Sequence, residues 1–74
     1  MSQTGERLRV LRDRAHLTQE QLGRRADVTT NTIARIEIGM VAKPQWRTIV
    51  RLANALGVST HELAGDDVQP ASTP

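Results

Sequence analysis

The sequence has no cysteine, tyrosine or phenylalanine, and it contains one tryptophan and two histidines. Without cysteine, the chain can form neither disulfide bonds nor thiolate metal sites. His16 and His61 lie far apart and have no partner at metal-ligand spacing, so we expect no bound metal. The scarcity of aromatic residues disfavours single-strand and RNA-binding modules, which stack bases on such side chains.

Long apolar runs and catalytic patterns are missing as well. No segment has the length and hydropathy of a signal peptide or a membrane span, which predicts a soluble, cytoplasmic protein without a membrane partner. No nucleophile stands beside a base, and no paired catalytic carboxylates or clustered metal ligands stand out, so we expect neither an enzyme nor a cofactor. A chain of 74 residues forms one small domain, and no disulfide or metal reinforces its core.

The net charge of +2 is unevenly distributed along the chain. Residues 1–51 hold all ten basic residues and five acidic ones, a net charge of +5, whereas the remainder holds three acidic residues and no basic one. A basic body suits a polyanionic partner, and arginine, which dominates here, makes forked contacts to phosphate or guanine. An ordinary solvated surface explains the charge equally well, so charge alone does not decide the function.

One local pattern recurs three times, a hydroxyl residue between two apolar residues at the N′ and N4 positions of a helix. Thr18, Thr29 and Ser59 are these hydroxyl residues, and each can act as an N-cap closed by a hydrophobic staple. With the apolar periodicity they predict an all-α, compact five-helix domain over residues 1–64 and a flexible acidic, proline-containing tail over 65–74. The expected helices are Thr4 to Ala15, Thr18 to Ala26, Thr29 to Ile38, Pro44 to Gly57 and Ser59 to Ala64.

The apolar faces of these helices predict a single core. Its expected members are Leu8, Leu11, Leu17, Leu22, Ala26, Val28, Ile33, Ile36, Trp46, Ile49, Leu52, Ala53, Leu56 and Leu63. The second and third helices are joined by a very short turn around Asp27 and Val28. Two helices joined in this way form a helix-turn-helix, whose second helix enters the major groove of DNA. Gly39 and an amphipathic fourth helix after this pair strengthen that interpretation.

The combination resembles the phage-repressor and Cro type of helix-turn-helix domain, the xenobiotic-response-element family. The segments that carry the resemblance are LTQEQL at 17–22, RA at 25–26, VT at 28–29, IARIE at 33–37, Gly39 and LANALGV at 52–58. It covers about Thr4 to Leu63. It implies a five-helix repressor-like fold, sequence-specific binding to double-stranded DNA, transcriptional regulation, often repression, and a homodimer on a two-fold symmetric operator.

The resemblance also assigns roles to individual residues. It implies that Thr30, Asn31 and Arg35 read bases, and their chemistry suits this: asparagine can pair with adenine, arginine with guanine, and a threonine methyl can touch thymine. The implied phosphate contacts come from the starts of the second and third helices and from the segment after the third, through Gln19, Thr18, Thr29, Thr32, Lys43 and, more weakly, Arg47.

Arg12 and Glu37 match a pair that in relatives forms a partly buried ion pair between the first and third helices. We interpret them as structural, with an exposed, DNA-contacting Arg12 as the alternative. His16 and Asp27 stand where family members usually have glycine, and both residue types tolerate positive φ. Ile38 stands where a polar residue is more usual.

A protein-interaction module of the same fold, antitoxin-like or an adaptor, is the competing functional class. Apolar surface around the last helix and the tail would then bind a protein partner. Affinity for phosphate falls steeply with salt and an apolar contact does not, so salt dependence distinguishes the two classes.

Overall fold

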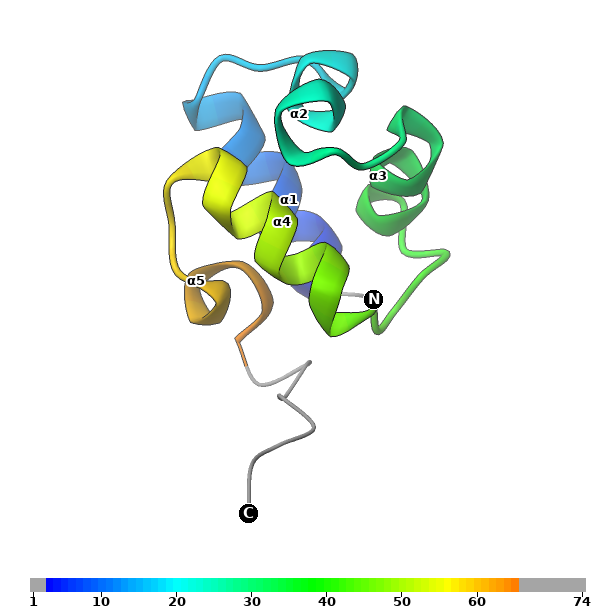
Figure 1. Cartoon of the computed structure of the whole chain (residues 1–74). Helices are drawn as coiled ribbons and strands as arrows, with labels where there is room; N and C mark the ends of the chain where they lie inside the picture. The colour runs from blue at the N-terminus through cyan, green and yellow to red at the C-terminus, as the bar shows by residue number, and fades with distance from the viewer. Residues whose placement is uncertain (1–2, 66–74) are drawn as a thin grey trace.

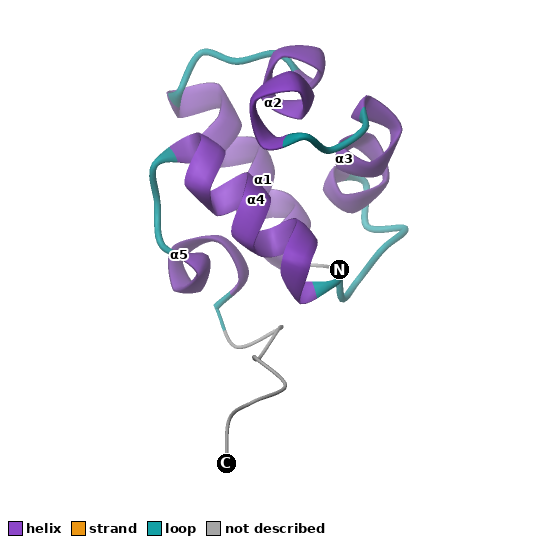
Figure 2. Ribbon diagram, viewed as in Figure 1, coloured by secondary structure: helices purple, strands orange, loops and turns teal. Residues whose placement is uncertain are grey.

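The structure, a computed structural model, describes residues 3–65. This part of the chain is all helical and contains no strand, as predicted (Figures 1 and 2). Its five helices are α1 (Gln3–Arg14), α2 (Gln19–Ala26), α3 (Thr30–Glu37), α4 (Trp46–Leu56) and α5 (Thr60–Ala64). The predicted tail lies outside the described residues apart from Gly65. None of the helices in 3–65 is both long and apolar enough to cross a membrane.

The helices close a ring of contacts. α1 packs against α3 and α5, α4 packs against α2 and α5, and α2 packs against α3. Figure 1 shows α2 and α3 beside each other and away from α5. The helix-turn-helix pair therefore forms one side of the molecule, and α1 and α4 connect it to α5.

The apolar core occupies the centre of this ring. Ten of the expected core residues are buried, together with Ala64, which the pattern did not single out. The remaining four, Leu11, Val28, Trp46 and Leu56, are half-buried and pack against the core from outside. The buried residues are Leu8, Leu17, Leu22, Ala26, Ile33, Ile36, Ile49, Leu52, Ala53, Leu63 and Ala64.

Three helices begin directly after a hydroxyl N-cap. The side chains of Thr18, Thr29 and Ser59 each accept a hydrogen bond from a backbone N–H of the first turn, at 3.0, 3.1 and 3.0 Å. At Thr18 the Gln21 side chain returns a bond to the cap backbone at 2.9 Å, which completes a capping box. The three helices therefore start one residue later than predicted, because the hydroxyl residue is the cap and not the first helical residue.

The predicted start of α4 at Pro44 is wrong. The helix begins at Trp46, and its N-cap is Gln45 in an extended conformation. Proline fixes its own φ near −65°, a value that also suits extended backbone, so it does not by itself decide where a helix starts. Pro44 is buried instead and anchors the loop that leads into α4.

Two glycines allow helices to approach each other closely. A Cβ on Gly5 of α1 would meet the carbonyl oxygen of Ile36 and lie 3.1 Å from that of Glu37, both at the end of α3. A Cβ on Gly23 of α2 would lie 2.6 Å from the carbonyl oxygen of Val28. The contacts with the carbonyl oxygens of Ile36 and Val28 are too short for a side chain. The two glycines therefore allow α3 to lie close to α1, and the turn to lie close to α2.

Candidate nucleic-acid interface

The turn between α2 and α3 is short and internally bonded. Asp27 adopts a left-handed conformation with φ 58°, as expected for a residue in a glycine position, and ends α2. His16 does the same after α1 with φ 57°. The N–H of Val28 donates to the carbonyl of Gly23 at 3.0 Å. This tight turn is possible because Gly23 has no side chain to meet Val28. The turn thus holds α3 in one orientation against α2.

The outer side of α3 carries the three side chains that were predicted to read bases. Thr30, Asn31 and Arg35 are all exposed, whereas Ile33 and Ile36 on the opposite side are fully buried. Asn31 and Arg35 are four residues apart and therefore lie on one face of the helix. Within residues 3–65 neither of these two side chains is held by a hydrogen bond or an ion pair, which leaves both available to a ligand. Their contact with bases stays a prediction.

The residues predicted to contact phosphate differ in whether their side chains already form hydrogen bonds within the protein. The hydroxyls of Thr18 and Thr29 serve as N-caps, and Thr29 shares a second bond of 2.7 Å with the Thr32 hydroxyl. Lys43 and Arg47 are exposed around the start of α4. The N-cap of α4 makes no side-chain hydrogen bond, so N–H groups of its first turn are open and carry the positive end of the helix dipole. Lys43 and Arg47 thus flank a region of positive potential.

Arg12 and Glu37 form a two-pronged ion pair between α1 and α3. Arg12 Nε donates to Glu37 Oε2 at 2.7 Å and Nη2 to Oε1 at 3.0 Å, while Nη1 donates to the carbonyl of Leu17 at 2.9 Å. The two side chains are 14% and 5% exposed. The hydrogen bond to Glu37 raises the pKa of Arg12 above its already high ordinary value, so the guanidinium stays charged. This geometry suits the structural role and leaves little of Arg12 for a ligand.

Gln19, the first residue of α2, has a partner that the sequence did not reveal. Its Nε2 donates to Glu37 Oε1 at 3.0 Å, and its side chain is half-buried. The two residues are separated by 18 positions, so no local pattern could have shown the contact.

Ile38 and Met40, just after α3, are exposed large apolar residues at 70% and 69%. Nothing in the structure explains the apolar residue at position 38.

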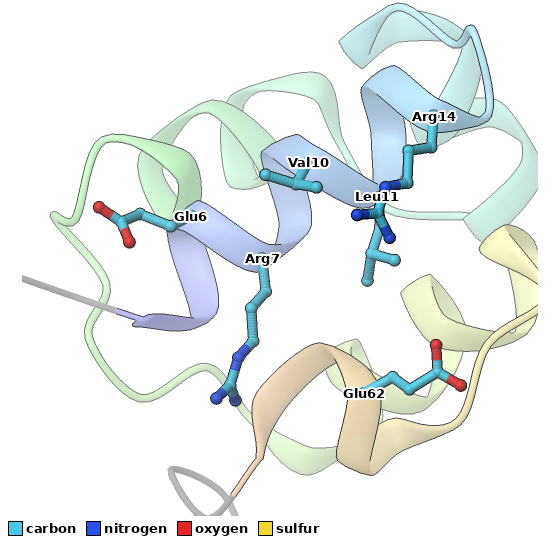
Figure 3. Close-up of a pocket in the computed structure, with 6 residues that line it drawn as sticks. All are labelled: Glu6, Arg7, Val10, Leu11, Arg14 and Glu62. Atoms are coloured by element: carbon cyan, nitrogen blue, oxygen red, sulfur yellow. The ribbon is translucent and has the colours of Figure 1, made fainter.

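A shallow hollow of about 350 Å³ is lined by side chains of α1 and α5 (Figure 3). Two basic and two acidic side chains surround Val10 and Leu11 there. The lining residues are Glu6, Arg7, Val10, Leu11, Arg14 and Glu62. In the part of the chain that the structure describes, no group of three or more potential metal ligands is present. The hollow therefore offers a surface of two apolar side chains among four charged ones.

Comparison with known proteins agrees with this geometry. A family model described as a helix-turn-helix domain matches residues 3–64. Among solved structures, the crystal structure of ComR from Streptococcus suis is similar, with a TM-score of 0.77 and 33% sequence identity. The similarity covers 96% of this chain and 23% of ComR, so the chain spans about a quarter of that protein's length. A comparison with curated protein sequences gives no match.

Proposed function

The chain belongs to the helix-turn-helix domain family, and from this membership we propose that it is a transcriptional regulator that binds duplex DNA in a sequence-specific manner. In this proposal α3 enters the major groove, Thr30, Asn31 and Arg35 face the bases, and Lys43 and Arg47 contact the backbone. The observation that carries the proposal is the two-sided character of α3. One side is fixed in the core by Ile33 and Ile36, and the other presents polar side chains without partners in the described chain.

We further propose the Cro-type mode of binding, in which two copies bind a two-fold symmetric operator. The half-sites would lie about one helical turn apart, roughly 10–10.5 bp centre to centre, or a multiple of that. Selection of bound sequences from a random duplex library tests binding, symmetry and spacing together. Enriched sequences without a repeated half-site would contradict the dimer, and no enrichment would contradict sequence-specific binding.

Arg35→Ala is expected to relax the base preference at one position of each half-site and to cost about 1–3 kcal/mol against the preferred base. The reason is that guanine N7 and O6 can accept both prongs of a guanidinium. The measurement is the affinity for the selected operator and for variants changed at each base pair. Arg24→Ala is the matched control, because Arg24 is exposed on α2 and pairs with Glu20 at 3.3 Å. Unchanged affinity and preference in Arg35→Ala would show that another surface reads the bases.

Lys43→Ala is expected to weaken binding to all duplexes by a similar factor. A cation that contacts phosphate releases about one counterion, so the slope of log affinity against log salt concentration should fall by about one. Affinities for the operator and for an unrelated duplex over a range of salt concentrations measure both effects. A change confined to the operator would place Lys43 at a base instead.

A protein-interaction module is the second candidate function. The hollow between α1 and α5 favours it, because Val10 is 46% exposed there between charged side chains. A protein partner on this surface would bind through apolar contact, and its affinity would change little with salt. Val10→Asp is expected to abolish such binding without affecting DNA affinity.

A further inference from the structure

The carboxylate of Glu37, at the end of α3, binds side chains from two other helices at once. Its Oε1 accepts a hydrogen bond from Arg12 Nη2 and another from Gln19 Nε2, both at 3.0 Å, and its Oε2 accepts from Arg12 Nε at 2.7 Å. Glu37 is thus the point where α1, the start of α2 and the end of α3 are joined. With 5% of its side chain exposed, Glu37 is nearly out of reach of any ligand.

The contact fixes how the Gln19 amide can lie. A carboxylate only accepts hydrogen bonds, so the amide must turn its NH₂ group and not its oxygen towards Glu37. One N–H is used in this bond, and the second N–H is left free. The opposite charge of Arg12 compensates the carboxylate, so the three side chains together add no net negative charge near a phosphate.

Among the side chains at the start of α2, Gln19 is the donor that α3 holds in place, through the bond to Glu37. Thr18 and Gln21 bond to each other's backbone in the capping box. Glu20 is anionic and pairs with Arg24 at 3.3 Å. The first turn of α2 therefore offers an anion backbone N–H groups and side-chain donors, and of these side chains the Gln19 amide is the one that Glu37 fixes.

We propose that Glu37 is a positioning residue for DNA binding, which holds the Gln19 amide in the orientation that donates to a backbone phosphate. This inference rests on the proposed function. A free glutamine side chain loses rotamer freedom when a ligand immobilises it, at a cost of about two- to tenfold in affinity. Glu37 removes that cost because it orders the side chain before DNA arrives.

The test compares Gln19→Ala in two backgrounds. The first is the natural chain, and the second carries Arg12→Met with Glu37→Leu, which removes the anchor without leaving a buried unpaired charge. Two quantities are measured, the affinity for the selected operator and the effect of ethylating each phosphate of that operator. Thermal unfolding establishes that the second background is folded at the assay temperature.

In the natural chain, Gln19→Ala is expected to weaken binding about three- to tenfold and to remove the sensitivity of one phosphate per half-site. In the second background, ethylation of this phosphate should no longer weaken binding, whereas ethylation of the other contacted phosphates should still weaken it. Gln19→Ala should change the affinity less than twofold there. Glu20→Gln is the matched control, because it removes an exposed carboxylate from the same turn and should leave the effect of Gln19→Ala intact.

Three results would overturn the inference. Gln19→Ala could cost the same factor in both backgrounds, which would make Glu37 irrelevant to the amide. It could cost nothing in the natural chain, so that the amide makes no phosphate contact. In the second background, ethylation could cease to weaken binding at every phosphate, which would show that Glu37 orients α3 as a whole. These outcomes differ from failure of the proposed function, in which the natural chain selects no duplex at all.

Discussion

Arg12→Ala is expected to lower the free energy of unfolding by up to about 3–5 kcal/mol, the range for removing one partner of a fully buried ion pair, because this pair is partly buried. Glu37 would stay in a site where 5% of its side chain is exposed, with the neutral amide of Gln19 as its remaining side-chain donor. The carbonyl of Leu17 would also lose its Arg12 donor. Small domains are stable by only about 5–15 kcal/mol, so this is a large share of the total. Urea denaturation followed by circular dichroism measures the loss.

Two comparisons show whether the ion pair is the cause. Arg9→Ala, an exposed arginine on the same helix, is expected to change the unfolding free energy by no more than about 0.5 kcal/mol. Arg12→Met combined with Glu37→Leu is expected to recover most of the loss, because apolar groups of similar size replace both charges. A double variant as unstable as Arg12→Ala would mean that the loss comes from packing and not from the unpaired carboxylate.

Gly5→Ala is expected to lower the free energy of unfolding by up to about 3 kcal/mol, the upper end of the range for overpacking. The new methyl group would meet the carbonyl oxygen of Ile36, and backbone atoms of α3 cannot rotate away as a flexible side chain can. The sign is informative, because glycine to alanine inside an exposed helix normally stabilises by about 0.5–1 kcal/mol. Thermal unfolding of Gly5→Ala beside Glu6→Ala, its exposed neighbour, checks the effect.

Displacement of the end of α3 in Gly5→Ala would also affect the candidate DNA interface. Gly5→Ala pushes against Ile36 and Glu37 and therefore moves the end of the helix that carries Arg35. We expect weaker operator binding at temperatures where the variant is still folded. If Gly5→Ala proved more stable than the natural chain, the close approach of α1 and α3 would be wrong.

Local features of the fold could be predicted from the sequence, because neighbouring residues determine them. The caps at Thr18, Thr29 and Ser59 depend on the first helical turn, and the left-handed His16 and Asp27 depend on their own residue types. The start of α4 could not be predicted in this way, because burial of Pro44 depends on the tertiary packing of its loop.

Contacts between distant residues account for what the sequence did not show at the candidate site. The bond from Gln19 to Glu37 joins residues 18 positions apart, and the approach of Gly5 to Ile36 joins α1 to the end of α3. Periodicity places each residue on a face of its own helix. It does not indicate which other helix packs against that face. The resemblance supplied the pairing of Arg12 with Glu37, which residue spacing alone does not imply. The roles of Thr30, Asn31 and Arg35 towards bases remain predictions.

The cyclic order of the helices has a consequence for how the domain unfolds. Each helix in the described chain packs mainly against two others, so detaching any one of them uncovers sides of two neighbours. Loss of α5, for example, would expose sides of both α1 and α4. Because α3 packs on α1 and α2 packs on α4, their packing would weaken as well. Loosening of α3 and melting of the whole domain should therefore be a single event, and hydrogen exchange in α3 should follow global stability.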